Sequence, residues 1–292
     1  MNRDFLNVSL QGRNRFRDYL IGVLLIFSST FVFVIFVMAI MAFFASFYDI
    51  SIFKKGGTDL LIYGNPFRTL VFSAGACAGL ILGLFLAVER VHKRNFLTLI
   101  NLEASISWYR IIEGFIVSLI LWMISFPIWY LINPSRYTII FNASEWLPFT
   151  LFALLMLPIM SLSVALFYAY ALQGLSLLNQ KPLFLLIIFA FFNCLDAKTI
   201  DEFILRGLSS IFTIWIVLKD NRLELVIGKI AANGLISMLF ISTFNSKLSM
   251  PTLIKIPDSS LPLSLNLVSF ILTSCLFYYI CFSLRRNRKI DL

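Results

Sequence analysis

The chain has 292 residues, of which 60% are hydrophobic and 13% are charged, and its mean hydropathy is +0.90. These values exclude an ordinary soluble domain. The formal net charge of +9 fits basic residues that flank membrane spans and meet anionic lipid headgroups. We therefore expect the lipid bilayer as the main partner and no nucleic-acid binding.

Eight apolar runs follow one another along the chain. A helix needs about 20 residues to cross a bilayer, and only the fifth and sixth runs fall clearly short of that length. The sequence therefore predicts an all-α polytopic membrane protein with about eight transmembrane helices, at residues 20–48, 70–87, 111–132, 146–172, 182–195, 203–218, 223–243 and 263–284.

The charges predict the domain limits and the orientation. Residues 1–19 form a polar, Arg-bearing arm, residues 20–284 the transmembrane domain, and residues 285–292 a basic tail. The first apolar run is too long for a signal-peptide core and has no small-residue cleavage site, so we expect a retained span. Most Lys and Arg residues lie in the arm, the tail and the loops that eight spans place on one side. The positive-inside rule then predicts cytoplasmic termini.

The chain offers little material for a metal or redox site. Its cysteines lie in or at the edge of apolar runs, and no pair has metal-binding or redox spacing. They are Cys77, Cys194, Cys275 and Cys281. A single histidine, His92, excludes a site with two histidine ligands. We expect no metal and no cofactor. Residues 89–110, which contain His92, mix basic and apolar side chains and are compatible with a short amphipathic segment in the membrane interface.

Two ionisable groups near predicted span ends have close partners in sequence. Glu113 lies three residues after Arg110, which predicts an i,i+3 ion pair at the mouth of the third span. Arg206 follows Asp201 and Glu202, which predicts a local pair or a side chain that reaches the interface.

Two further charged residues stand close to the expected spans. Asp196 ends the fifth span, where it is expected to face water or Lys198. Lys229 lies about two turns into the seventh span. It is expected to reach the cytoplasmic interface, with Glu224 as a partner, although a role as a catalytic base stays open.

A set of short motifs follows in order between residues 88 and 243. They are His92-Lys93-Arg94, Trp108-Tyr109-Arg110, Trp146-Leu147-Pro148, Leu157-Pro158-Ile159, Gln173-Gly174-Leu175 and Leu223-Glu224 with Ile227-Gly228. In this order they resemble the framework of the CPBP family, the CAAX-processing and bacteriocin-processing proteases, also called Abi. The resemblance implies an eight-span intramembrane endopeptidase fold in a bacterial inner membrane or a thylakoid-type membrane.

The positions that carry catalytic residues in the family differ here. The resemblance implies two glutamates, an arginine, two histidines and an asparagine. This chain instead has Ser163, Val164, Tyr168, Asn193, Ile230 and Gly234 at those positions. Valine, isoleucine and glycine cannot exchange a proton near neutral pH, so the family chemistry is absent as written.

Three functions stay open from the sequence. The first is a non-catalytic pseudoprotease that binds a membrane segment, a prenyl or lipid chain, or a membrane protein in the former active-site cavity. The second is an active intramembrane endopeptidase that uses Ser163 as nucleophile and Lys229 as base. The third is a small transporter or an assembly factor. Asn193 and Asn233 are expected to form interhelical hydrogen bonds rather than an oxyanion site.

Overall fold

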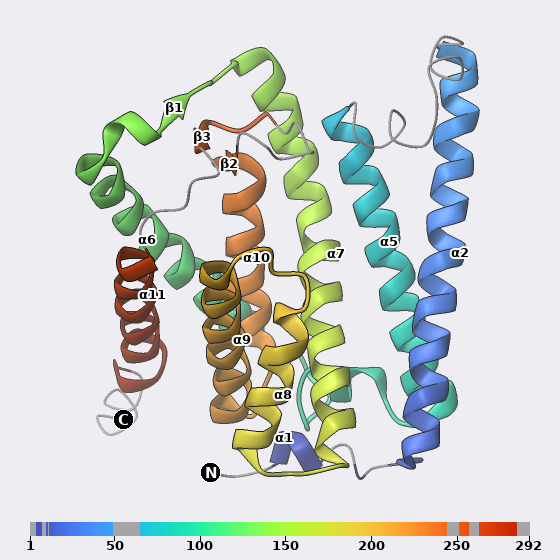
Figure 1. Cartoon of the computed structure of the whole chain (residues 1–292). Helices are drawn as coiled ribbons and strands as arrows, with labels where there is room; N and C mark the ends of the chain where they lie inside the picture. The colour runs from blue at the N-terminus through green and yellow to red at the C-terminus, as the bar shows by residue number, and fades with distance from the viewer. Residues whose placement is uncertain are drawn as a thin grey trace.

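The computed structural model describes residues 4–7, 10, 12–48, 65–243, 251–256 and 263–284. This part of the chain is a helical bundle with one small sheet (Figure 1), which confirms the predicted all-α class. The helices are α1 (Asp4–Asn7), α2 (Phe16–Tyr48), α5 (Pro66–Leu86), α6 (Trp108–Ile132), α7 (Ala143–Ser176), α8 (Pro182–Cys194), α9 (Ile200–Asp220), α10 (Glu224–Leu239) and α11 (Leu263–Tyr278). The predicted basic tail lies outside the described residues.

Five helices are long and apolar enough to cross a membrane. They run over Phe16–Phe43, Pro66–Val91, Trp108–Ile132, Ala143–Ser176 and Leu263–Ser283. The chain is therefore a multi-pass membrane protein. The other three predicted spans form α8, α9 and α10, which do not meet these requirements of length and hydropathy. The count of eight spans is thus not confirmed.

Helices α8 and α9 form a hairpin. At 13 residues, α8 is roughly 20 Å long, which is less than the hydrocarbon thickness of about 30 Å. The turn between α8 and α9 lies about halfway along the neighbouring α7 and α10 (Figure 1). The Cys194 thiol donates a hydrogen bond of 3.2 Å to the Phe203 carbonyl across this turn. The two predicted spans therefore turn back on each other instead of each reaching the far end of the bundle.

Side-chain caps explain where several helices begin. Asn65 accepts hydrogen bonds from the amides of Phe67 and Arg68 at the start of α5, and Asn142 caps α7 in the same way. Thr199 accepts a hydrogen bond from the amide of Glu202 at the start of α9. Such caps satisfy amide groups that have no partner within the helix. These helices consequently begin three or four residues before their apolar runs.

A three-stranded sheet closes one end of the bundle. Its strands are β1 (Thr138–Ile139), β2 (Ile241–Thr243) and β3 (Ile254–Ile256), in the order β1-β3-β2. Strand β2 follows directly after α10, so the seventh predicted span ends at Leu239 and not at residue 243. The predicted span ran on because Phe240 and Ile241 continue the apolar run of the helix across its end.

Glycines set the closest helix crossings. A Cβ atom on Gly83 of α5 would lie 2.6 Å from the Ile26 Cα of α2. Gly114 of α6 lies against the Leu225 backbone of α10, and Gly228 of α10 lies against the Ile111 backbone of α6. These three positions have no room for a side chain, and they hold α2 against α5 and α6 against α10.

The N-terminal arm is part of the packed structure. Phe5 and Leu6 of α1 are fully buried in the main hydrophobic core, and α1 packs against α7. The arm is therefore more than the polar extension that its sequence predicted.

Candidate functional site

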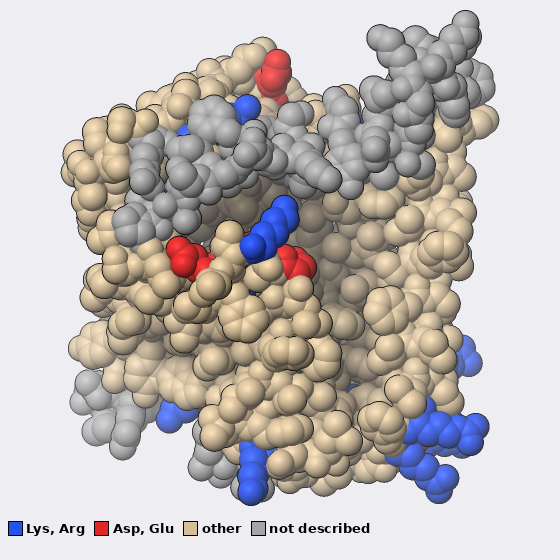
Figure 2. Space-filling model, viewed as in Figure 1, with Lys and Arg blue, Asp and Glu red and all other residues tan. Residues whose placement is uncertain are grey.

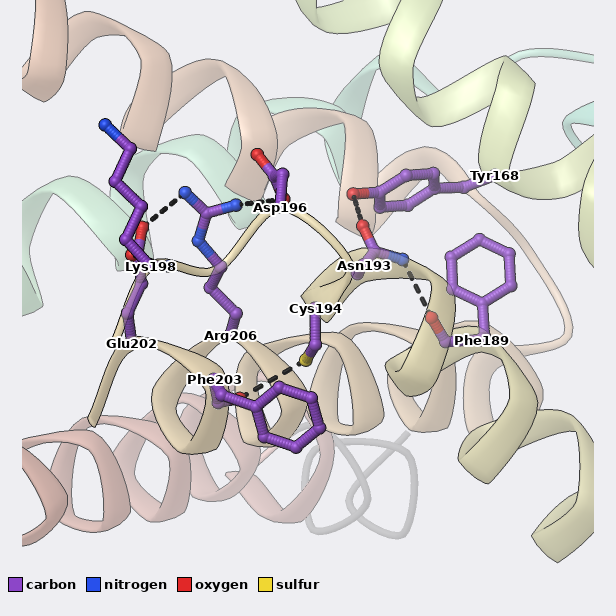
Figure 3. A network of polar contacts seen from close by, with 9 residues as sticks. All are labelled: Tyr168, Phe189, Asn193, Cys194, Asp196, Lys198, Glu202, Phe203 and Arg206. Carbon is purple, nitrogen blue, oxygen red and sulfur yellow. Dashed lines mark hydrogen bonds and ion pairs between the residues drawn. The ribbon is translucent and has the colours of Figure 1, made fainter. Parts of the chain in front are cut away.

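The structure joins two of the six altered motif positions. The Tyr168 hydroxyl of α7 donates a hydrogen bond of 2.8 Å to Asn193 Oδ1 of α8 (Figure 3). The Asn193 amide in turn donates to the Phe189 carbonyl, and the Phe189 ring meets the Tyr168 ring edge-on at 5.0 Å. Asn193 thus forms an interhelical hydrogen bond, as expected, and one of its two amide N–H donors is already occupied.

The other four motif positions are divided between different faces. Ser163 is fully buried, and its hydroxyl donates to the Met160 carbonyl at 2.8 Å. Val164 is 38% exposed. Ile230 packs against the main hydrophobic core. Gly234 faces α7, where its Cβ position is 3.1 Å from Leu157 Cδ1.

Lys229 does not reach Glu224 or Ser163. Its Nζ donates a hydrogen bond of 3.0 Å to Thr213 Oγ1 of α9 and lies 5.6 Å from the centre of the Phe212 ring. The pairing expected with Glu224 is therefore not formed, and Ser163 and Lys229 bind different partners on different helices.

Lys229 instead faces a cavity of about 350 Å³ between α6, α9, α10 and α11, which we call the C-terminal cavity. Aromatic side chains form much of its wall, with hydroxyl and amide groups among them. The main lining residues are Ser118, Trp122, Ser125, Phe126, Trp129, Ser209, Phe212, Lys229, Asn233, Ser269, Phe270 and Ser274. Its described lining includes no residue of α7 or α8, the helices that carry Ser163, Val164, Tyr168 and Asn193, so it is not the former active-site cavity that the resemblance implies.

The turn between α8 and α9 carries a cluster of charged residues. Arg206 lies between Asp196 and Glu202, with an N–O distance of 2.5 Å to each (Figure 3). The local pair with Glu202 is confirmed, while Asp196 is exposed and pairs with Arg206. The Arg206 guanidinium lowers the pKa of the Asp196 carboxyl. Acidic and basic side chains lie side by side over this turn, halfway up the molecule (Figure 2).

A second polar cluster is buried below α7. His92 Nδ1 donates to the Arg13 carbonyl at 2.8 Å, so its Nε2 accepts the Tyr170 hydroxyl at 3.0 Å. Arg94 donates to Gln173 Oε1 at 2.7 Å. His92 and Arg94 are buried, so these two basic side chains of residues 89–110 pack inside the molecule. Burial lowers the pKa of His92.

A third cluster joins α6 to α9. Arg110 forms the predicted pair with Glu113, at 2.5 Å, and a second ion pair with Asp220 at the end of α9. Glu224 is fully buried and accepts hydrogen bonds from the Asn101 amide at 2.7 Å and from the Ser107 backbone at 3.3 Å. These contacts explain why Glu224 is not available to Lys229.

The described residues contain no group of three or more His, Cys, Asp or Glu side chains that could hold a metal ion. The four cysteines are free.

The sequence reasoning missed the C-terminal cavity and the buried state of His92, Tyr170 and Gln173. A signal for the cavity was present. Serine, threonine and asparagine recur in α6 and α11 at Ser118, Ser125, Asn266, Ser269 and Thr273, and all five line the cavity. Small polar residues in apolar helices mark helix interfaces or cavities.

Comparison with known proteins identifies a bacterial relative. The chain is 28% identical over 198 residues to the uncharacterized protein YyaK of Bacillus subtilis, a match that covers 64% of this chain and 66% of the relative. The chain is thus a distant homologue of that protein. No family model matches the chain, and no solved structure matches it.

Proposed function

We propose that this chain is a non-catalytic relative of the CPBP proteases that binds a lipid chain within the membrane. The C-terminal cavity carries this proposal. Its volume of about 350 Å³ lies at the small end of the range for ligand pockets, about 300–1,000 Å³. A helix with side chains is about 10–12 Å wide, so the cavity suits one narrow chain better than a membrane segment of a partner protein.

The motif positions support the non-catalytic part of the proposal. A general base must lie within hydrogen-bond reach of the group from which it takes a proton. Ser163 donates to Met160 and Lys229 donates to Thr213, so no hydrogen bond joins the two members of the alternative dyad. Tyr168 and Asn193 use their polar groups on each other. None of these contacts supplies an activated water or nucleophile.

Tryptophan fluorescence tests the lipid-chain proposal. Trp122 and Trp129 line the cavity, so a brominated long-chain alcohol bound there quenches their emission. We expect saturable quenching of the purified protein in detergent. Ser274→Leu, which fills the cavity, should reduce the quenching, whereas Ser144→Leu on the exposed start of α7 should not. Equal quenching in all three proteins would contradict the proposal.

A cleavage assay tests the protease alternative. We expect no cleavage of a panel of labelled membrane peptides. If the wild-type protein cleaves a peptide and both Ser163→Ala and Lys229→Ala abolish that cleavage, the Ser163–Lys229 protease replaces the binding protein. Loss of cleavage in neither variant would point to a contaminating protease.

We also propose that both chain ends face the cytoplasm. The described start of α2 and the described end of α11 lie at the same end of the bundle (Figure 1). The α7–α8 and α9–α10 connections, which contain Lys181 and Arg222, lie at this end as well (Figure 1). Reporter fusions after Asn179 and after Asn142 should report opposite sides, with the Asn179 site cytoplasmic. The reverse result would overturn this orientation.

A further inference from the structure

The wall of the C-terminal cavity has one charge. Among the described residues that line it, Lys229 is the single ionisable group with a charge at neutral pH, and no carboxylate is present. The remaining lining residues are aliphatic, aromatic, hydroxyl or amide side chains. The cavity wall therefore combines apolar side chains with neutral polar groups and has one positive charge.

The charge and the N–H donors of Lys229 are only partly matched by other described residues. An ammonium group has three N–H donors, and Thr213 accepts one of them at 3.0 Å. The Thr213 hydroxyl donates to the Ser209 carbonyl, which fixes its oxygen as the acceptor for Lys229. The Phe212 ring adds a cation–π contact at 5.6 Å. No ion pair joins Lys229 to a described carboxylate.

The acidic residues nearest to Lys229 along α10 and α9 would have to give up their own hydrogen bonds or ion pair to reach it. Glu224, five residues earlier on α10, is held by Asn101 and Ser107. Asp220, at the end of α9, is paired with Arg110. An ionisable group inside a membrane protein is costly unless a partner compensates it. A compensating group is thus expected from outside the part of the chain that the structure describes.

A neutral donor lies on the neighbouring wall. The Ser118 hydroxyl of α6 is buried at the cavity and has no hydrogen-bond partner in the described structure. Ser118 stands one turn beyond Gly114, the residue at which α6 crosses α10. Asn233 stands one turn beyond Lys229 on α10 and also lines the cavity. One cation with hydroxyl and amide donors on the same walls is suited to a group with one negative charge and two acceptor oxygens.

We propose that the ligand of the C-terminal cavity is a single-chain fatty acid whose carboxylate pairs with Lys229 and whose alkyl chain lies against Trp122, Phe126 and Phe270. The inference rests on the proposed function, that the cavity takes a lipid chain, and adds the headgroup. A monovalent carboxylate matches the single cation. The small volume favours one chain over the two chains of a phospholipid.

Two probes with the same chain separate the headgroup from the tail. Dibromostearic acid and dibromostearyl alcohol are titrated into the purified protein in detergent, and quenching of tryptophan emission is followed. We expect the acid to bind at least about ten-fold more tightly than the alcohol. Such a difference corresponds to about 1.4 kcal/mol. Acetate in excess should not displace the acid, because it offers the charge without the chain.

Variants assign the preference to Lys229. Lys229→Met keeps the length of the side chain and removes its charge, so it should bind acid and alcohol equally. Lys229→Arg should retain part of the preference. Lys181→Met, at the exposed start of α8 and outside the cavity, should behave as the wild type. The comparison of the two probes in the wild type is decisive even if Lys229→Met fails to fold.

The outcomes distinguish the inference from the proposed function. Equal affinity of acid and alcohol for the wild type would overturn the fatty-acid inference and leave the lipid-chain proposal intact. Absence of saturable quenching by either probe would overturn both. A preference for the acid that persists in Lys229→Met would place the carboxylate elsewhere and also overturn the inference.

Discussion

The two halves of the bundle are held together in different ways. In the first half, α2 and α5 meet through glycines so closely that Gly79 and Gly83 have no room for a Cβ atom. In the second half, α6, α9, α10 and α11 surround the C-terminal cavity. Each half contains helices that are long and apolar enough to cross a membrane, α2 and α5 in the first half and α6 and α11 in the second. Composition therefore does not decide where a membrane bundle is filled and where it is hollow; the positions of the small residues do.

Small residues act differently in the two halves. The glycines of α5 bring backbones together, which fills space. The serines and threonines of α6 and α11 are too short to fill the gap between their helices, and several hydrogen-bond to the carbonyl one turn earlier, as Ser125 and Thr273 do. Among the described glycines of the hollow half, close backbone contact is confined to the α6–α10 crossing at Gly114 and Gly228, and cohesion at this end also depends on the Arg110 ion pairs.

The largest expected effect tests this dependence. Arg110→Met should destabilise the protein by about 3–5 kcal/mol, because it leaves Glu113 and Asp220 buried without their cation. Thermal unfolding in detergent measures the loss. Arg206→Met, which removes a cation from a more exposed cluster, is the matched control and should cost about 1 kcal/mol or less. Equal effects would mean that the Arg110 pairs do not hold the hollow half together.

The next effect concerns the filled half. Gly83→Ala places a methyl group 2.6 Å from the Ile26 Cα, and backbone cannot move aside cheaply. We expect a loss of about 1–3 kcal/mol in stability. Gly207→Ala of α9 is the control, since its Cβ meets only the Cys194 sulfur, at 3.4 Å. If both substitutions were neutral, the close packing of α2 on α5 would not be a source of stability.

In the hollow half, a larger side chain should raise stability or leave it unchanged, whereas in the filled half it should lower stability. Ser274→Leu extends into the C-terminal cavity and should be neutral or stabilise the protein by about 0.5–2 kcal/mol, the usual gain from filling a cavity. The unfolding temperature and the quenching by a brominated chain are measured on the same sample. Loss of stability together with unchanged quenching would show that the cavity is not the space that Ser274 faces.

Much of the fold was predictable because hydropathy and breakers are local signals. Pro66 and Pro182 mark helix starts, and the predicted start of α8 is confirmed exactly where Lys181-Pro182 stands. The caps at Asn65, Asn142 and Thr199 were visible in the sequence, yet apolar runs alone place the helix starts too late. The pair of Arg110 with Glu113 was predictable from their i,i+3 spacing, whereas the pair with Asp220 depends on tertiary packing.

The α8–α9 hairpin and the environment of Lys229 could not be predicted in the same way. An apolar run has the same hydropathy whether its helix crosses the membrane or turns back halfway. The features of the sequence that indicate the hairpin are the short apolar run of α8 and the charged residues Asp196, Lys198 and Glu202 that follow it. Lys229 was expected to reach the interface with Glu224 as its partner. The sequence of α10 alone does not indicate that Glu224 accepts hydrogen bonds from Asn101 and Ser107 and so is not available to Lys229.

The smallest expected effect on stability comes from the titration of His92. It is absent at neutral pH and appears only at acidic pH. His92 lies in the loop below the filled half, where burial lowers its pKa from the usual value of about 6.5. Nearby Arg94 lowers it further, while the Arg13 carbonyl and Asp18 oppose the shift. The unfolded chain therefore binds a proton at a higher pH than the folded chain, and stability falls as the pH drops below about 6.5 towards the lowered pKa.

His92→Gln tests this titration. Glutamine supplies one donor and one acceptor, so it replaces the contacts of neutral His92 with Arg13 and Tyr170 and cannot take up a proton. The unfolding temperature should fall less steeply between pH 7.5 and pH 5 in His92→Gln than in the wild type, with little difference at pH 7.5. Parallel curves would mean that other groups carry the acid sensitivity. A loss of stability at pH 7.5 as well would show that the imidazole ring contributes packing against Tyr19 beyond its hydrogen bonds.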